Sequence, residues 1–101
     1  MIVCAVDLET TGLSPETDHI IEIGMVLWDT DRKKPVKLAS FLINDHIAAV
    51  SPEITNITKI TKEELRDFGV PLGYAIPHII SMMVAAPIVA HNGNLFDKPF
   101  L

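Results

Sequence analysis

The sequence predicts a single α/β domain built on a mixed four-stranded sheet. Apolar runs suited to strands cover residues 2–6, 19–29 and 36–43, and turn-forming residues separate them. An amphipathic helical pattern over residues 72–86 precedes a fourth apolar run at residues 87–91. Because a helical crossover leads into this last run, it can lie parallel to the first strand and beside it. The expected sheet is therefore a three-strand antiparallel meander plus a parallel fourth strand.

The composition fits one small folded domain. The chain has 101 residues, 49% of them hydrophobic and 21% charged, so it is too apolar for a disordered segment and too short for a second core. The one cysteine, Cys4, cannot form an intrachain disulfide, which favours a reducing, cytoplasmic compartment. Residues 75–90 are the most apolar stretch, but prolines interrupt them and they are too short to span a membrane. We therefore expect a cytoplasmic protein with no membrane partner.

The charge balance limits how the chain could contact nucleic acid. The net charge of −5 argues against a broad basic surface for duplex binding. An acidic site that holds metal ions can still bind a phosphodiester, because the ions reverse the local field. The basic residues 32–34 leave two alternatives open: contact with a phosphate backbone, or a solvated tip that protects the sheet edge.

The first strand ends in an acidic segment. Asp7 and Glu9 follow the first apolar run, and residues two apart on a strand share a face. Two close carboxylates repel unless a cation lies between them, and hard divalent cations take oxygen ligands. The pair therefore indicates a Mg²⁺ or Mn²⁺ site or, taken alone, a solvated strand end before the turn at Gly12.

The second strand is expected in the interior of the sheet, because residues 19–29 are apolar on both faces. Alternation places Ile21 on the same face as Ile23. Glu22 stands out within this apolar run, and it is either paired in the interior or a support for the metal site. An exposed hairpin loop is predicted over residues 29–35.

Three helical segments follow. Ser51 and the proline after it have the form of a helix start, for which a short turn is expected. Residues 61–64 form a capping box that opens a short helix ending at Gly69. The helix over residues 72–86 should tolerate Pro77 only in its first turn. Its predicted core positions are Ile76, Ile79, Ile80, Met83 and Val84.

The predicted topology brings the acidic residues together. Parallel first and fourth strands would deliver Asp7, Glu9 and His91 to one edge of the sheet, with Asp97 just beyond in the first turn of a helix. Binding clefts in such sheets lie at the carboxyl ends of the strands. This edge is therefore the predicted site.

Three segments resemble a known enzyme family. Residues 7–13, Asp-Leu-Glu-Thr-Thr-Gly-Leu, are similar to the first acidic motif of the DEDD-type 3′–5′ exonucleases, which share a ribonuclease H-like fold and include proofreading subunits and oligoribonucleases. Residues 89–101 resemble the second motif as it occurs in three-prime repair exonucleases. Residues 54–58 and the helix capped by Thr61 resemble the connecting segment. The resemblance covers essentially the whole chain and implies a ribonuclease H-like α/β fold with flanking helices.

The resemblance also implies an activity and its metal ligands. It implies a 3′–5′ exonuclease that hydrolyses phosphodiesters from the 3′ end of DNA or RNA, releasing nucleoside 5′-monophosphates with two Mg²⁺ or Mn²⁺ ions. By this resemblance Asp7, Glu9 and Asp97 are the catalytic carboxylates that hold the ions. The implied partners are a single-stranded or frayed 3′ end and a DNA polymerase, and a homodimer is left open.

Four further residues are candidates for substrate binding. By the resemblance, Thr10 and Leu13 would contact the terminal nucleotide, through hydrogen bonding and apolar packing respectively. His91 and Asn92 either contact the substrate or form a hydrogen-bonded turn. These two alternatives stay open from the sequence.

One motif of the family has no counterpart in the sequence. Family members carry a His or Tyr followed within a few residues by a fourth Asp, whereas this sequence ends at Leu101, shortly after Asp97. Residues 1–101 are therefore expected to be the N-terminal part of one exonuclease domain, incomplete at the C-terminus and weakly active or inactive alone. The alternative, from another functional class, is a non-catalytic module that binds nucleic-acid ends or docks on a polymerase.

Overall fold

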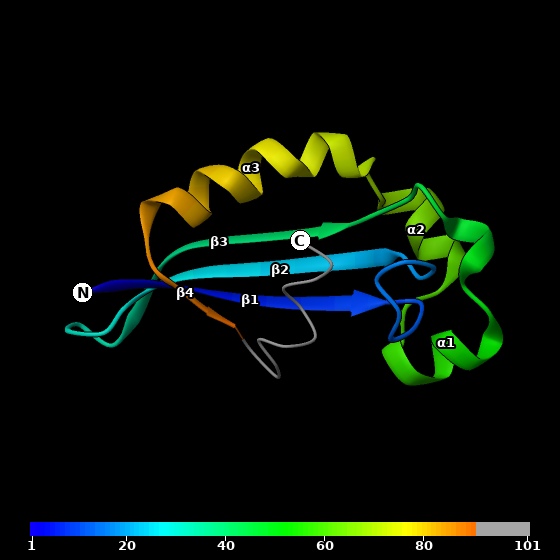
Figure 1. The fold of residues 1–101 in the computed structure, drawn as a ribbon, viewed down its shortest axis with the longest axis horizontal. Coiled ribbons are helices and arrows are strands. Elements are labelled where there is room, and N and C mark those ends of the chain that lie inside the picture. The colour runs from blue at the N-terminus through cyan, green and yellow to red at the C-terminus, as the bar shows by residue number, and fades with distance from the viewer. Residues whose placement is uncertain (91–101) are drawn as a thin grey trace.

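The computed structural model describes residues 1–90, and a four-stranded sheet organises them. Strands β1 (Ile2–Thr10), β2 (Ile20–Asp29) and β3 (Lys34–Leu42) form an antiparallel meander. Strand β4 (Ile88–Ala90) pairs with β1 in parallel, which gives the order β3-β2-β1-β4 (Figure 1). This arrangement confirms the predicted topology, with β2 in the interior of the sheet.

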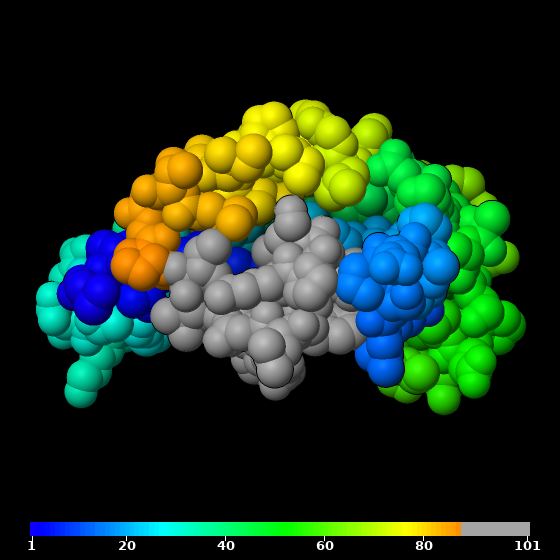
Figure 2. Space-filling model, in the orientation of Figure 1, coloured from blue at the N-terminus to red at the C-terminus, as the bar shows by residue number. Residues whose placement is uncertain are grey.

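The helices lie on one face and at one end of this sheet. Helix α3 (Leu72–Ala85) runs along a face, whereas α1 (Pro52–Thr58) and α2 (Lys62–Phe68) lie beyond the end of β1 (Figure 1). A 3₁₀ turn, Ile47–Ala49, precedes α1. In the space-filling view the loop between β1 and β2 projects next to α1 and α2 (Figure 2). No helix in residues 1–90 is long and apolar enough to cross a membrane.

Side-chain caps explain where the two short helices begin. The hydroxyl of Ser51 accepts the backbone N–H of Ile54 at 3.2 Å, so α1 has the predicted cap and extends over two turns. Thr61 and Glu64 form the predicted capping box, in which each side chain accepts the other's backbone N–H at 3.1 and 3.2 Å. Gly69 caps the end of α2, as predicted.

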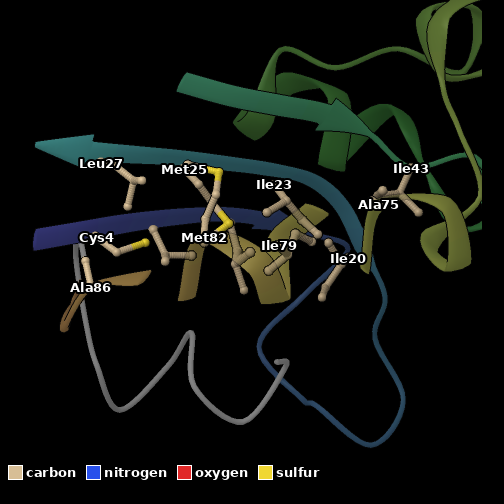
Figure 3. Close-up of a cluster of buried hydrophobic side chains, with 12 residues drawn as sticks. Cys4, Ile20, Ile23, Met25, Leu27, Ile43, Ala75, Ile79, Met82 and Ala86 are labelled. Atoms are coloured by element: carbon tan, nitrogen blue, oxygen red, sulfur yellow. The ribbon is translucent and has the colours of Figure 1, made fainter. Parts of the chain in front are cut away.

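The main hydrophobic core lies between α3 and one face of the sheet. Met82 of α3 lies next to Met25 of β2, and Ile79 lies near Ile23 (Figure 3). Burying a side chain of this size contributes about 1.5–3 kcal/mol relative to leaving it exposed. Every second residue of β1 packs into this core. The side chains of the residues between them therefore lie on the opposite face of the sheet. The buried β1 members are Cys4, Val6 and Leu8.

The core-facing side of α3 differs from the prediction. Its buried residues are Ala75, Ile79 and Met82, which recur at steps of four and three. The prediction was wrong for Ile80 and Val84, which are 52% and 80% exposed. The helix meets the sheet along one narrow stripe, and these two residues fall on its other side.

Pro77 also lies elsewhere in α3 than predicted. It is inside the helix, beyond the first turn. Because proline has no N–H, the carbonyl of Gly73, four residues earlier, receives no intrahelical bond. Both residues are exposed, so water can solvate that carbonyl. This exposure explains how the helix continues through a proline.

A β-bulge changes which face of the sheet the first residues of β2 occupy. The register shifts between Glu9 and Thr10. As a result Ile20 joins the α3 core, whereas Ile21 joins a second cluster against the short helices. The prediction that Ile21 shares a face with Ile23 was therefore wrong, because a bulge inserts one residue and reverses the alternation. The other buried residues of the second cluster are Val50, Ile60 and Leu65.

The hairpin between β2 and β3 is tighter than predicted. Asp29 pairs with Lys34, so β3 starts two residues before the expected Val36. Lys33 adopts a left-handed backbone conformation with φ of 56°, which closes the turn. Arg32 donates to the Asp29 carboxylate at 2.6 Å. The basic loop lies at the end of the sheet opposite α1 and α2 (Figure 1).

Candidate functional site

Asp7 and Glu9 share one face of β1, as the sequence predicts. Their neighbours Val6 and Leu8 are buried under α3, so the two carboxylates are on the opposite face of the sheet. Asp7 is exposed and Glu9 is half-buried. The α3 core thus sets the direction of both acidic side chains, which can offer oxygen atoms to a ligand on this face.

Glu22 adds a third acidic group next to this pair. It lies directly opposite Glu9 on the neighbouring strand β2. Partial burial raises the pKa of Glu22, and the negative charges of Asp7 and Glu64 raise that pKa further. This face of the sheet therefore favours a cation, because each added carboxylate increases the local negative potential.

A groove lies beside Asp7 on the same side of the sheet. Within residues 1–90 its volume is about 560 Å³, and strands β1, β2 and β3 all line it. Asp7 is the one charged lining residue among otherwise small or apolar neighbours. These neighbours include Ala5, Gly24, Val26 and Leu38.

The two candidate substrate contacts lie at the end of β1 and in the loop that follows it. Leu13 is 80% exposed. Thr10 is buried, and its hydroxyl donates to the carbonyl of Gly12 at 2.6 Å. The Thr10 hydroxyl therefore holds the shape of the loop, and the exposed Leu13 side chain is available to a ligand. Contact of either residue with a nucleotide stays a prediction.

The remaining predicted site residues lie outside the described part of the chain. These residues are His91, Asn92 and Asp97. Among residues 1–90, no three His, Cys, Asp or Glu side chains are grouped to hold a metal ion. Asp7 and Glu9 are nevertheless suitable ligands for Mg²⁺ or Mn²⁺, because they place carboxylate oxygens on one accessible face. Their role as metal ligands stays a prediction.

Asp18 is a feature of this loop that the sequence reasoning missed. Its carboxylate accepts the Thr11 hydroxyl at 3.2 Å and the backbone N–H of Ser14 at 3.0 Å. The available signal was an aspartate at the end of a turn-forming cluster, where such side chains often bond the nearby backbone. Which backbone N–H this carboxylate would accept could not be predicted from sequence alone, because it depends on how the loop folds.

Two histidines also meet beside this loop. The rings of His19 and His46 stack with centroids 3.6 Å apart and an interplanar angle of 11°. They line a small cavity of about 160 Å³ together with Asp18 and Asp45. This cavity lies on the core side of the loop, because it also includes Ile20. It is separate from the groove next to Asp7.

Comparison with known proteins relates this geometry to nucleases. A family model described as exonuclease, RNase T, matches residues 4–101. DNA polymerase III subunit epsilon from Treponema pallidum is 40% identical over 98 residues, which are 96% of this chain and 43% of that protein. DNA polymerase III PolC-type from Caldanaerobacter subterraneus subsp. tengcongensis is 37% identical over 95 residues, which are 94% of this chain and 6% of that protein. The chain therefore spans less than half the length of either relative.

A solved structure supports the same fold. E. coli exonuclease I in complex with an oligonucleotide superimposes with a TM-score of 0.83 at 21% identity, covering 98% of this chain and 22% of that protein. At this identity the likeness concerns the fold, which is ribonuclease H-like. The family match over nearly the whole sequence shows more, and the chain belongs to the exonuclease family that carries this fold.

Proposed function

We propose that this chain forms part of a metal-dependent 3′–5′ exonuclease that releases nucleoside 5′-monophosphates. The observation that carries the proposal is the placement of Asp7 and Glu9 on one accessible face of β1, opposite the α3 core. Family membership makes the chain part of a nuclease. The 3′–5′ direction, the products and the metal dependence are the proposed refinements.

The acidic face explains how the chain's own residues would contribute. Asp7 and Glu9, together with Asp97, would hold two Mg²⁺ or Mn²⁺ ions, which when bound activate water and stabilise the leaving 3′ oxygen. The exposed Asp7 carboxylate borders the groove, so it can also orient groups that enter there. The raised pKa of Glu22 marks a site where bound cations would relieve repulsion between carboxylates.

The substrate and partners are also proposals. The polymerase relatives and the oligonucleotide complex of exonuclease I support a single-stranded or frayed 3′ end as substrate and a DNA polymerase as partner. Leu13 would pack against the terminal nucleotide, since its apolar side chain is 80% exposed. We also propose a cytoplasmic location, because the lone Cys4 favours a reducing compartment.

The direction of degradation tests this proposal. We expect the full-length protein to shorten a 5′-labelled single strand stepwise with Mg²⁺ present, so that the label stays on progressively shorter strands. The unlabelled products should be nucleoside 5′-monophosphates. A strand blocked at its 3′ end should persist. Release of labelled mononucleotide at the outset would show the opposite direction, and binding of the end without turnover would identify a non-catalytic module.

A further inference from the structure

We infer that Asp18 is a positioning residue that presents Leu13 to the substrate. The inference rests on the proposed function and identifies which residue sets the geometry of the loop after β1. Asp18 is the last loop residue but one before β2 and lies outside the acidic motif at residues 7–13. Its carboxylate nevertheless controls both chain neighbours of Leu13.

Hydrogen bonds provide the first part of this control. One carboxylate oxygen of Asp18 accepts the backbone N–H of Ser14 at 3.0 Å, and the other accepts the Thr11 hydroxyl at 3.2 Å. Thr11 is itself fixed, because its hydroxyl accepts the His19 backbone N–H at 2.9 Å and its own N–H donates to the His19 carbonyl at 2.9 Å. Hydrogen bonds to a charged acceptor are stronger than neutral ones, so a single side chain ties both sides of the loop together.

Close packing provides the second part. A Cβ atom added to Gly12 would lie 2.6 Å from the carboxylate carbon of Asp18 and in contact with both carboxylate oxygens. A residue larger than glycine at this point would therefore displace the Asp18 carboxylate from its observed position. Gly12 and Ser14, the residues on either side of Leu13, are thus both held against the same carboxylate.

The exposure of Leu13 shows why such control is needed. A side chain that is 80% exposed gains little from packing within the domain, so packing cannot fix its direction. The backbone on either side must fix it instead. A ligand that packs on Leu13 then binds a surface that is already ordered, so less conformational entropy is lost on binding.

A positioning role of Asp18 and a purely electrostatic role predict opposite changes in substrate binding when the carboxylate is removed. Nucleic acid is a polyanion, so a loop carboxylate acting only by its charge would weaken binding, and its removal would strengthen binding. A positioning role predicts the reverse. Glu16 offers a matched control, because it is an exposed carboxylate in the same loop, two residues away.

Steady-state kinetics of the full-length protein on a short 3′-ended single strand test the inference. We expect Asp18→Ala to raise KM about tenfold, equivalent to about 1.4 kcal/mol of binding, and to change kcat less than about threefold. Asp18→Asn keeps one acceptor oxygen and should fall between the wild type and Asp18→Ala. Glu16→Ala should leave KM unchanged or lower it. Thermal unfolding of each variant shows whether it is folded.

A double mutant identifies Leu13 as the residue through which Asp18 acts. If Asp18 works by presenting Leu13, the variant Leu13→Ala/Asp18→Ala should have the KM of Leu13→Ala alone, because coupled residues are not additive. Additive effects would overturn the inference, as would a lower KM in folded Asp18→Ala. Failure of the inference can be distinguished from failure of the proposed function, which Asp7→Asn tests: loss of turnover in Asp7→Asn with a normal KM in Asp18→Ala would remove the inference alone.

Discussion

Glu9 and Glu22 lie directly opposite each other on the antiparallel strands β1 and β2. Burial and the charges of Asp7 and Glu64 raise the pKa of Glu22, so its ionised form is less favourable in the folded protein than in the unfolded chain. Ionised Glu22 therefore lowers the stability of the folded domain, and it lies on the sheet face that carries Asp7 and Glu9.

Replacing Glu22 should reveal that interaction as a pH-dependent gain in stability. A raised folded pKa means that wild-type stability falls as the pH rises above 4.5, the ordinary value for this carboxyl. We expect Glu22→Gln to melt at a higher temperature than the wild type at pH 7 in EDTA. The difference should shrink as the pH falls through 4.5 and below, where the Glu22 carboxyl becomes protonated in both states. An equal or lower melting temperature at pH 7 would show that Glu22 is favourably paired as a carboxylate.

Metal binding should depend on Asp7 and not on acidic charge in general. We expect Asp7→Asn to weaken Mn²⁺ binding at least tenfold, about 1.4 kcal/mol, because it removes an exposed carboxylate ligand. Asp31→Asn is the matched control: it removes the same charge from the hairpin, where Asp31 binds the N-terminal amine at 2.8 Å. Calorimetric titration measures both. Equal affinities for Asp7→Asn and Asp31→Asn would remove Asp7 from the metal site.

The basic hairpin should contribute little to activity. The pairing of Ile2 with Asp29 and of Glu9 with Glu22 places the hairpin at the far end of β1 from the acidic residues. Ile2 and Glu9 are separated by about 23 Å, at about 3.3 Å per strand residue, and Ile2 and Asp7 by about 17 Å. Both distances exceed the Debye length of about 8 Å at physiological salt. We expect charge reversal of Lys33 and Lys34 to change mononucleotide release less than about tenfold. A hundredfold loss would place the hairpin on the substrate path.

The hairpin should instead contribute an acid-sensitive part of the stability. Hydrogen bonds from the Arg32 side chain and backbone lower the pKa of Asp29 from 3.8 to about 2. A lowered folded pKa stabilises the fold above about pH 4, and this contribution is lost as the pH falls towards about 2. We expect the wild type to melt above Asp29→Asn at pH 6, with the gap closing across that window. A gap independent of pH would exclude the Asp29 carboxylate as its source.

Much of the fold could be predicted because local patterns and tertiary structure agree. The apolar alternation of β1 set the face of Asp7 and Glu9, and the caps at Ser51 and Thr61 marked two helices. These signals involve residues close together in the sequence. The role of Asp18 could be recognised only from the three-dimensional structure, since it depends on how the loop folds back on Gly12.

The errors in the fold have a tertiary origin. Hydrophobic spacing alone assigned Ile80 and Val84 to the core, but the sheet accepts a narrower stripe of α3. The sheet face on which Ile21 lies depends on a bulge. A bulge cannot be recognised in a sequence run that is apolar on both faces. In both cases the missing information was the shape of the partner surface.

The measurement that tests the central claim most directly is mononucleotide release by Asp7→Asn and Glu9→Gln variants of the full-length protein. Both changes keep the side-chain volume and remove a carboxylate from the exposed face of β1. With Mg²⁺ and a 3′-ended single strand, we predict at least a hundredfold loss of turnover in each, whereas Asp31→Asn retains wild-type activity. Wild-type turnover in folded Asp7→Asn and Glu9→Gln would contradict the assignment of this face as the catalytic one.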